Sequence, residues 1–374
     1  MTRADRDSGE ETPSGLKFQV LAESLRRRIA DGEWEPGAKL PTEKDLSAAS
    51  GLSLTTVRRA LDELADQHLV RRRQGSGTFV SARAASLHNS TLTVGLLVPS
   101  TTQYYPRVIS GIEAALSAGG ARMVLSCYRY KAEEEDEDIA SLLAAGVDGL
   151  LLVPTLTGIA DPAGRARELN DLGVPAVFIE RRVVDSGPRD SSEYVRTDHE
   201  AGAYEAIEHL ARLGHRRIGL VCRFPNPTGI WVARGYESSM AELGLEAQEP
   251  YLAEAGRWSQ DRADEAVAHL QRVGVSAALV FGDREGAWLE GAARRAGLRI
   301  PQDLALVAYD DESADVAEIP LTAVSPPKYE LGRLAAEILM RRLRANQPTP
   351  IHQISLRPRI VVRSSCGGTE RKHR

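Results

Sequence analysis

The sequence contains few cysteines, no long apolar run and none of the common enzyme motifs, and each shortage excludes a class of protein. Among its 374 residues there are three cysteines, Cys127, Cys222 and Cys366, which are far apart and form no CxxC pair. A disulfide framework or a zinc site is therefore not expected, and a reducing cytoplasm is the natural compartment.

Membrane insertion, export and catalysis are not expected either. No apolar run approaches the length that spans a bilayer. The N-terminal stretch MTRADRDSGEETPSG is polar and acidic, without the apolar core of a signal peptide. GxSxG, HExxH and His/Cys clusters with metal-ligand spacing are missing. We therefore expect no catalytic residues, no metal and no cofactor.

The length and the charge distribution point to a small basic segment joined to a larger acidic one. A chain of this length, 42% hydrophobic and 26% charged, suggests two or three domains. The formal net charge is -5, but residues 17–83 carry 12 Lys and Arg against 9 Asp and Glu. A basic head on an acidic body indicates a polyanionic partner for the head.

The head begins with a pattern of short helices. Phe18, Leu21, Leu25 and Ile29 have helical spacing, and the stretch EWEPG then ends the helix. In a second helix, residues 42 and 45 are the Thr and Asp of a capping box. A glycine at 51 ends that helix, and a serine at 53 can cap the third. Two short helices joined by a tight glycine turn predict a helix-turn-helix.

The third helix would enter the major groove with its N-terminal turns against the bases. Val57, Leu61 and Leu64 are expected to face inward. Hydroxyl and guanidinium groups suit the opposite, solvent-facing side, because they donate to phosphates and to guanine edges. The expected DNA contacts there are Thr55, Thr56, Arg58 and Arg59.

The stretch RRRQGSGTFV, residues 71–80, admits two interpretations. A phosphate-binding loop would need a strand before it, a helix after it and, in the Walker type, a lysine. Here the glycines lie between the strand-like runs LVRRR and GTFVSA, and no GK[ST] follows. We therefore interpret it as a β-hairpin wing. Arg73, Gln74, Gly75 and Ser76 are its expected DNA contacts.

The head resembles the winged-helix domain of the GntR family of bacterial regulators. The resemblance rests on LRRRIADGEWEPGAKLPTEKDLSAASGLS, TTVRRALDEL and RRRQGSGTFV. Leu54 departs from the family, whose members often have an arginine at this position. A leucine cannot hydrogen-bond a guanine but can pack on a thymine methyl. The operator sequence therefore cannot be inferred from relatives. The DNA contacts that the resemblance implies are Lys44, Ser53, Thr55, Thr56, Arg58, Gln74 and Gly75, and we count Leu54 with them.

In the body, apolar strand-like runs alternate with amphipathic helical segments. This pattern predicts parallel sheets covered on both faces, and some 280 residues favour two α/β lobes. The expected fold is thus multidomain α/β, a winged helix-turn-helix followed by a two-lobed α/β body. The expected segments are a disordered tail (1–16), the head (17–80), a linker (81–91), the body (92–365) and a disordered tail (366–374).

Polar residues follow the apolar runs, where ligands bind in open α/β sheets. Examples are Tyr104 and Tyr105, Glu180 and Arg181, and the Asp310-Asp311 pair. Carboxylates, arginine and aromatic rings in one cleft suit a polyhydroxylated ligand. Taken singly, an aspartate in such a position is about as often a helix cap.

The body resembles the two-lobed, periplasmic-binding-protein-like effector domain of LacI-type repressors, over nearly all of residues 92–365. The most characteristic blocks are LGHRRI and IPQDLALVAYDD, and with the GntR-type head they give an arabinose-repressor-like architecture. The effector contacts that this resemblance implies are Tyr104, Tyr105, Arg181, Asp198, Asp283 and Asp310.

Three positions depart from the LacI-type pattern. Val232 occupies the place of a sugar-gripping arginine, with Trp231 or Arg234 as its candidate replacement. Gly282 replaces an asparagine, and Pro326 replaces a common glutamine. A free pentose or hexose is therefore a plausible effector, but the departures also allow a non-sugar effector or none.

We expect a cytoplasmic homodimeric repressor that binds a palindromic operator in double-stranded DNA and responds to a small, carbohydrate-like effector. The linker lacks the proline-containing hinge helix of LacI-type proteins. Two alternatives come from other classes. An aminotransferase-like body needs a Schiff-base lysine, but none of the three lysines after the head lies in a matching context. A sugar-binding module would explain the body but not the head.

Overall fold

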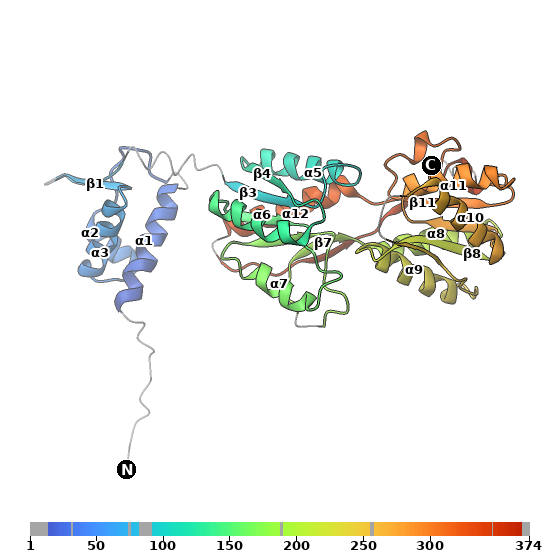
Figure 1. Cartoon of the computed structure of the whole chain (residues 1–374). Coiled ribbons are helices and arrows are strands. Elements are labelled where there is room, and N and C mark those ends of the chain that lie inside the picture. The colour runs from blue at the N-terminus through green and yellow to red at the C-terminus, as the bar shows by residue number, and fades with distance from the viewer. Residues whose placement is uncertain are drawn as a thin grey trace, which may run out of the picture. The chain divides into compact units, whose positions relative to one another are not determined.

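The computed structural model describes residues 14–30, 33–73, 76–81, 92–187, 190–254, 258–345 and 347–368. The chain divides into two compact units, Met1–Thr91 and Leu92–Arg374, which are the head and the body (Figure 1). The expected linker falls almost wholly on residues 82–91, outside the described part of the chain.

The head consists of three helices and a two-stranded antiparallel hairpin. Its core is apolar: Leu25 and Ile29 of the first helix and Val57, Leu61 and Leu64 of the third are buried. The first helix starts at residue 14, inside the segment expected to be a tail. The elements are α1 (Ser14–Ala30), α2 (Glu43–Ser50), α3 (Leu54–Asp66), β1 (Val70–Arg73) and β2 (Gly77–Val80).

Local capping fixes the helix-turn-helix. The Thr42 hydroxyl accepts from the Asp45 backbone N–H and the Asp45 carboxylate accepts from that of Thr42, so the predicted capping box is confirmed. Gly51 ends α2 with a φ of 67°, a left-handed conformation that favours glycine. Ser53 caps α3 by accepting from the Thr56 N–H at 3.2 Å.

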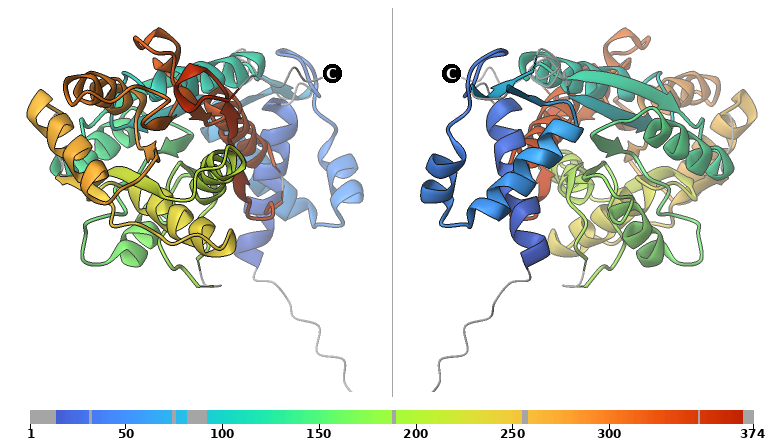
Figure 2. Two further views of the ribbon diagram at one scale, coloured as in Figure 1. Left: turned by 90° about the vertical axis from the view of Figure 1, so that its right-hand side faces the viewer. Right: turned by 90° about the vertical axis from the view of Figure 1, so that its left-hand side faces the viewer.

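The first lobe of the body is a six-stranded, all-parallel sheet in the order β13-β7-β6-β5-β3-β4. The long helix α12 packs beside α5, as two further views show (Figure 2). The elements of this lobe are β3 (Thr93–Val98), α5 (Tyr105–Ala118), β4 (Arg122–Cys127), α6 (Ala132–Ala144), β5 (Gly149–Leu152), α7 (Pro162–Asn170), β6 (Ala176–Ile179), β7 (Tyr194–Thr197), α12 (Lys328–Arg344) and β13 (Gln353–Leu356).

The second lobe repeats this plan with the strand order β14-β12-β11-β10-β8-β9, in which only β14 is antiparallel. Its central strands are wholly buried and apolar, as expected for a parallel sheet covered on both faces. The elements are α8 (His199–Arg212), β8 (Ile218–Phe224), α9 (Gly229–Glu242), β9 (Tyr251–Glu254), α10 (Gln260–Arg272), β10 (Ala277–Val280), α11 (Asp283–Arg295), β11 (Ala305–Tyr309), η2 (Ala314–Val316), β12 (Thr322–Ser325), β14 (Arg359–Val361) and η3 (Ser364–Cys366).

The described chain passes between the lobes three times. It crosses from β7 to α8 at Asp198, from β12 to α12 at Pro326, and from β13 to β14 at Pro358. The Asp198 N–H donates to the Leu356 carbonyl at 2.8 Å, which ties two of these crossings together. A two-lobed body hinged in this way can change the angle between its lobes.

The body extends beyond its expected end at residue 365. Cys366, assigned from the sequence to a disordered tail, is 2% exposed and belongs to η3. Its Sγ lies 3.2 Å from His209 Nε2 and 3.0 Å from the Thr322 hydroxyl. A small apolar side chain at this place completes the second lobe's core, which is why the ordered chain continues through it.

Candidate functional site

The head exposes the side chains expected to contact DNA. Thr56 is half-buried, and its hydroxyl lies 2.8 Å from that of Ser53. Gln74 and Gly75, the predicted tip of the wing, lie outside the described residues. The exposed members of the predicted set are Lys44, Ser53, Leu54, Thr55, Arg58, Arg59, Arg73 and Ser76.

Ion pairs connect α2, α3 and the wing. Arg58 Nε lies 2.9 Å from the Glu43 carboxylate, and Arg72 Nη2 lies 3.9 Å from the same group. Arg72 also donates to the Arg58 carbonyl at 3.2 Å. The guanidinium of Arg59 lies 4.0 Å from the centre of the Phe18 ring. Acidic and aromatic neighbours therefore orient Arg58, Arg59 and Arg72.

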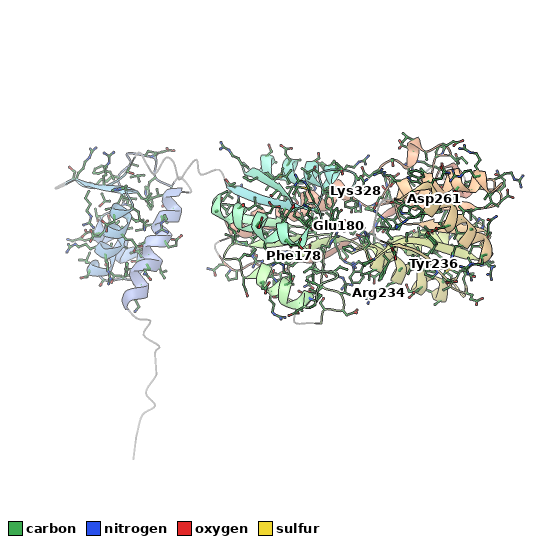
Figure 3. The ribbon with its side chains drawn as sticks, viewed as in Figure 1. Phe178, Glu180, Arg234, Tyr236, Asp261 and Lys328 are labelled. Atoms are coloured by element: carbon green, nitrogen blue, oxygen red, sulfur yellow. The ribbon has the colours of Figure 1, made fainter. Side chains whose placement is uncertain are left out.

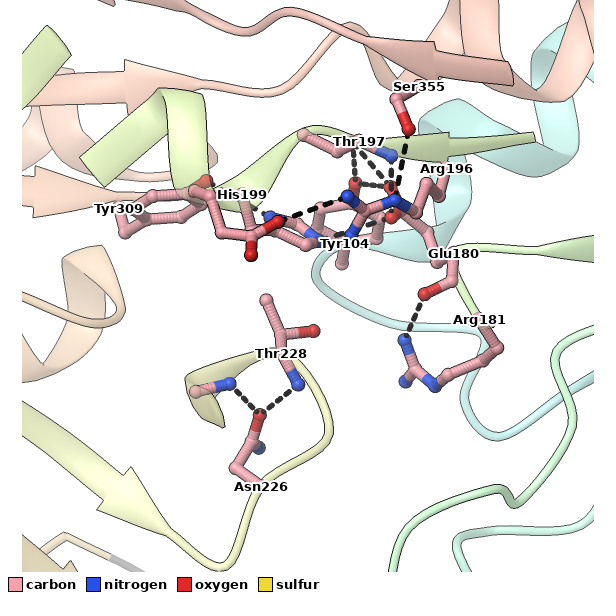
Figure 4. A network of polar contacts seen from close by, with 12 residues as sticks. Tyr104, Glu180, Arg181, Arg196, Thr197, His199, Asn226, Thr228, Tyr309 and Ser355 are labelled. Atoms are coloured by element: carbon pink, nitrogen blue, oxygen red, sulfur yellow. Dashed lines mark hydrogen bonds and ion pairs between the residues drawn. The ribbon is translucent and has the colours of Figure 1, made fainter. Parts of the chain in front are cut away.

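In the body, a buried polar network centres on Glu180, directly after β6 (Figure 4). Its carboxylate accepts from the Thr197 N–H at 3.0 Å, from the Thr197 hydroxyl at 2.6 Å and from the Tyr104 phenol. His199 Nε2 lies 3.2 Å from it, and His199 Nδ1 lies 3.0 Å from the Tyr309 hydroxyl of the second lobe. The network thus links a predicted ligand residue, Tyr104, to the first crossing between the lobes.

The charge of Glu180 is stabilised by these contacts. Burial acts to raise the pKa of Glu180, but hydrogen bonds from His199, Thr197 and Tyr104 outweigh it and lower the pKa to about 2. A carboxylate that accepts several hydrogen bonds prefers its ionised form. Glu180 is therefore the ionised acceptor that the hydrogen-bond donors of this network share.

Arg181 and Tyr105 also meet on the first lobe, as predicted. Arg181 is 9% exposed; it donates to the Glu180 carbonyl at 3.0 Å (Figure 4) and to the Tyr105 hydroxyl at 3.5 Å. Within the described chain, no carboxylate lies within 4 Å of its guanidinium. A buried arginine without a paired acid can still donate to a bound molecule.

The predicted aspartates of the second lobe lie close to one another, but they differ in role. One oxygen of the Asp283 carboxylate accepts from the backbone N–H groups of Glu312 and Ser313, and the Asp283 side chain is 4% exposed. Asp310 is half-buried; burial and the neighbouring Asp283 charge raise its pKa to about 7. Lys328 donates to the Asp310 carbonyl and forms an ion pair with Glu312 at 2.6 Å. Asp310 is therefore better placed than Asp283 to meet a ligand.

Asp198 has a structural role. It is the N-cap of α8, where its carboxylate accepts from the Ala201 N–H at 3.1 Å. This is the helix-cap role that an aspartate after a strand often plays. A ligand contact by Asp198 stays a prediction.

A cavity of about 620 Å³ opens at the carboxyl ends of the second lobe's strands. Gln103, between β3 and α5, brings the first lobe into its wall. None of the lining residues was predicted from the sequence, because most of them come from helix faces and from the loop before α10, and none of the predicted effector contacts is among them. The lining residues are Gln103, Arg223, Trp258, Ser259, Gln260, Arg284, Glu285 and Trp288.

Trp231 and Arg234 of α9 are not among the residues that line this cavity. Trp231 is 4% exposed, and the guanidinium carbons of Arg182, Arg196 and Arg234 lie 4.2, 5.0 and 5.3 Å from its ring centre. Both nitrogens at the end of Arg234 bond the Asp185 carboxylate, at 2.9 and 3.0 Å. These residues join the lobes, and Figure 3 labels Arg234, Glu180 and Lys328 in the region where the lobes meet.

Val232 lies in the core of the second lobe with no exposed surface. Its side chain therefore cannot reach a ligand in this arrangement. In the part of the chain that the structure describes, no group of three or more His, Cys, Asp or Glu residues could hold a metal ion. None of the described helices is long and apolar enough to cross a membrane.

Known proteins resemble both units. Residues 18–80 match the family described as bacterial regulatory proteins, gntR family, and residues 207–366 match the periplasmic binding protein-like domain. An arabinose metabolism transcriptional repressor from Geobacillus stearothermophilus is 29% identical over 357 residues, which cover 93% of this chain and 97% of the relative.

Two further comparisons concern the regulator CelR. The HTH-type transcriptional regulator CelR of Thermobifida fusca is 29% identical over 343 residues, covering 87% of this chain and 98% of the relative. A solved structure of a transcriptional regulator CelR–cellobiose complex has a TM-score of 0.62 at 25% identity, covering 87% of this chain and 100% of that one. The predicted fold class is confirmed, whereas the individual contact residues stay predictions.

Proposed function

We propose that this chain, a DNA-binding transcriptional regulator, changes its affinity for an operator when a sugar or sugar derivative binds in the cleft of the body. The chain joins a GntR-type helix-turn-helix domain to a periplasmic-binding-protein-like domain. The relative named for arabinose metabolism and the CelR–cellobiose complex support a carbohydrate effector. The observation that carries the proposal is the cavity at the strand ends, lined by two tryptophans, two arginines and an acid.

The head is proposed to read DNA with α3 in the major groove and the hairpin against the backbone. Exposed hydroxyl and guanidinium groups on α3, including Thr55 and Arg58, support this orientation. Leu54, 40% exposed at the first position of α3, offers an apolar contact to a thymine methyl.

A homodimer on a palindromic operator is the assembly we propose, because one small head contacts too little DNA for a specific affinity of about 10⁻⁸ to 10⁻¹¹ M. The body offers a surface for a second copy. A groove of about 460 Å³ along α11 is bordered by Trp288 and Val316, which are 41% and 77% exposed. Large apolar side chains at such exposure favour a protein contact.

The proposed mechanism is a population shift between lobe arrangements. A ligand that binds one arrangement more tightly than the other changes how the two bodies meet, and the two heads then no longer fit the operator spacing. Repression relieved by the ligand is the direction we propose. DNA is the target, so the bacterial cytoplasm is the proposed compartment.

The experiment that tests this function is a nuclease footprint of the full chain on the DNA upstream of its own gene, at fixed physiological salt. A protected palindrome is expected, and one member of a carbohydrate panel is expected to remove the protection. Salt must be fixed because phosphate contacts make such affinities strongly salt-dependent. Absence of protection on this DNA and on random-sequence libraries would contradict the proposal.

A thermal unfolding assay tests the ligand half of the proposal separately. A ligand at roughly 100 times its Kd stabilises the folded chain by about 2.7 kcal/mol. The expected result is a rise in the unfolding temperature with the same compound that releases DNA. A different rank order in the two assays would separate ligand binding from regulation.

A further inference from the structure

The donors and charges that line the cavity of the body restrict the chemistry of its ligand. The cavity wall carries two arginines, Arg223 and Arg284, but one acid, Glu285. Arg223 Nε lies 3.5 Å from a Glu285 carboxylate oxygen, so this acid is already shared with one guanidinium. Arg284, on the exposed side of α11, has neither an ion pair nor a hydrogen bond among the residues that the structure describes. Both guanidinium groups therefore share one acid of the wall, since burial raises the pKa of Glu285 and Arg223 and Arg284 both act to lower it.

One buried donor of the same wall also lacks a hydrogen-bond acceptor. The indole nitrogen of Trp258 has no hydrogen-bond partner among the described residues, whereas Nε of Arg223 has its ion-pair contact with Glu285 at 3.5 Å. Indole and guanidinium groups donate hydrogen bonds and accept none. A molecule that contacts the exposed guanidinium of Arg284 must consequently supply acceptors, and most favourably acceptors that carry negative charge.

Arg181 of the first lobe adds no free charge to this wall. It is 9% exposed, is not among the residues that line the cavity, and interacts electrostatically with Glu180 beside it.

Other acidic side chains lie nearby but do not line the cavity. One carboxylate oxygen of Asp283 accepts from the backbone N–H groups of Glu312 and Ser313, and Glu312 is paired with Lys328 at 2.6 Å. Burial raises the pKa of Asp310 to about 7, so near neutral pH much of it is protonated and can donate to a hydroxyl. These groups suit the polyol part of a ligand, whereas the arginines suit an anionic part.

Aromatic rings complete the wall. Trp258 and Trp288 both line the cavity, and Trp288 is 41% exposed. An indole face packs on the apolar C–H face of a sugar ring, and this contact is compatible with a charged group at the ring's edge.

From these contacts we infer that the effector is an anionic polyol, a sugar that carries a carboxylate or a phosphate, with Arg284 and Arg223 as its charge-recognising residues. The inference rests on the proposed function of the cavity as the effector site. It goes beyond that proposal because it selects one class of carbohydrate.

The test uses matched pairs of compounds on the full chain. Thermal unfolding is measured with D-glucose, D-glucuronate and D-glucose 6-phosphate, with D-galactose and D-galacturonate, and with D-ribose and D-ribose 5-phosphate, at equal pH and ionic strength. At least one acid or phosphate is expected to raise the unfolding temperature more than its neutral parent does. The uronate and phosphate members of the panel distinguish the two sources of charge.

Variants then connect the effect to the arginine. Arg284→Gln is expected to raise the Kd of the stabilising anion by about tenfold or more, as loss of a charge-assisted hydrogen bond does. Arg284→Lys should retain part of the affinity. Arg212→Gln, which removes a positive charge from α8 outside the cavity, is the matched control and should leave the Kd unchanged. Sedimentation velocity checks that Arg284→Gln leaves the assembly intact, because Arg284 also borders the groove along α11.

Three results would overturn the inference: a neutral sugar that stabilises as strongly as its acid or phosphate, no stabilisation by any compound of the panel, or an unchanged Kd in Arg284→Gln. A neutral sugar that releases operator DNA would overturn it while leaving the proposed function in place. Failure of the chain to bind DNA would contradict the proposed function without changing the ligand result.

Discussion

Arg234 and Asp185 form a two-pronged ion pair between the lobes, in which the two terminal nitrogens of the arginine lie 2.9 and 3.0 Å from the two carboxylate oxygens. Arg234 belongs to α9 of the second lobe, and Asp185 follows β6 of the first. The same helix carries Trp231, which lies between arginines of both lobes. The hydrogen bonds from Arg234 lower the pKa of Asp185, so the pair stays ionised at neutral pH.

We expect this ion pair to influence the lobe arrangement and to add little to stability, because both side chains are largely exposed. Asp185→Arg and Arg234→Asp should each change effector affinity severalfold, and the double exchange should restore most of it. The measurement is titration calorimetry with the compound that stabilises the chain most. Effects that simply add in the double variant would show that the pair does not couple the lobes.

Glu180→Gln should destabilise the body by roughly 1–3 kcal/mol, because an amide would present N–H groups to donors that now meet a carboxylate. The variant is compared with wild type by urea unfolding at neutral pH. Glu246→Gln, a change at an exposed glutamate in the same unit, is the control. Equal midpoints for wild type and Glu180→Gln would contradict the role of the network.

The same carboxylate predicts a pH dependence. Its folded-state pKa of about 2 lies below its ordinary value of 4.5, so the ionised group stabilises the fold above the ordinary value. That contribution is lost as pH falls from 4.5 toward 2. The stability difference between wild type and Glu180→Gln should therefore be constant near neutral pH and shrink in this acid window. A difference that stays constant down to pH 2 would contradict the lowered pKa.

Arg58→Gln should weaken operator binding by about 1–3 kcal/mol, since Arg58 is exposed on the recognition helix and oriented by Glu43. If it contacts a phosphate, the salt dependence of binding should also become shallower. Fluorescence anisotropy with the footprinted DNA measures both effects. Arg28→Gln is the control for the loss of one positive charge from the head: Arg28 lies on α1 and pairs with Glu33. Equal losses in the two variants would argue against a specific contact by Arg58.

Val316→Glu should disrupt the proposed dimer, because Val316 is the most exposed large apolar side chain among those described and borders the groove along α11. Sedimentation velocity should show a shift toward monomer, with weaker operator binding. Leu213→Glu introduces the same charge at an exposed leucine on the end of α8, away from the groove, and should leave the dimer intact. A dimer that survives Val316→Glu would place the interface elsewhere.

The fold was largely predictable because local patterns determine it. The apolar runs of the body form the strands β3, β4, β5, β6, β8, β10 and β11, and the cap residues Thr42, Gly51 and Ser53 act as predicted. The strands β7, β9, β12, β13 and β14 are less apolar, so periodicity alone did not identify them. Their place is set by pairing with distant strands.

The site was predictable only where residues follow strands. Tyr104, Tyr105 and Arg181 meet as expected, and Asp310 lies near Asp283. Helix-borne residues such as Trp288 and Arg284 gave no signal, because which face of a helix borders a cavity depends on tertiary packing. The same is true of Arg234, whose predicted ligand role competes with its ion pair to Asp185.

Operator binding in the presence of the stabilising compound tests the central claim most directly. The dissociation constant of the full chain for its footprinted DNA is measured across a titration of that compound at fixed salt. The account predicts a change of about fivefold or more that saturates where the compound saturates the body. A dissociation constant that stays the same while the compound is bound would contradict ligand-modulated DNA binding.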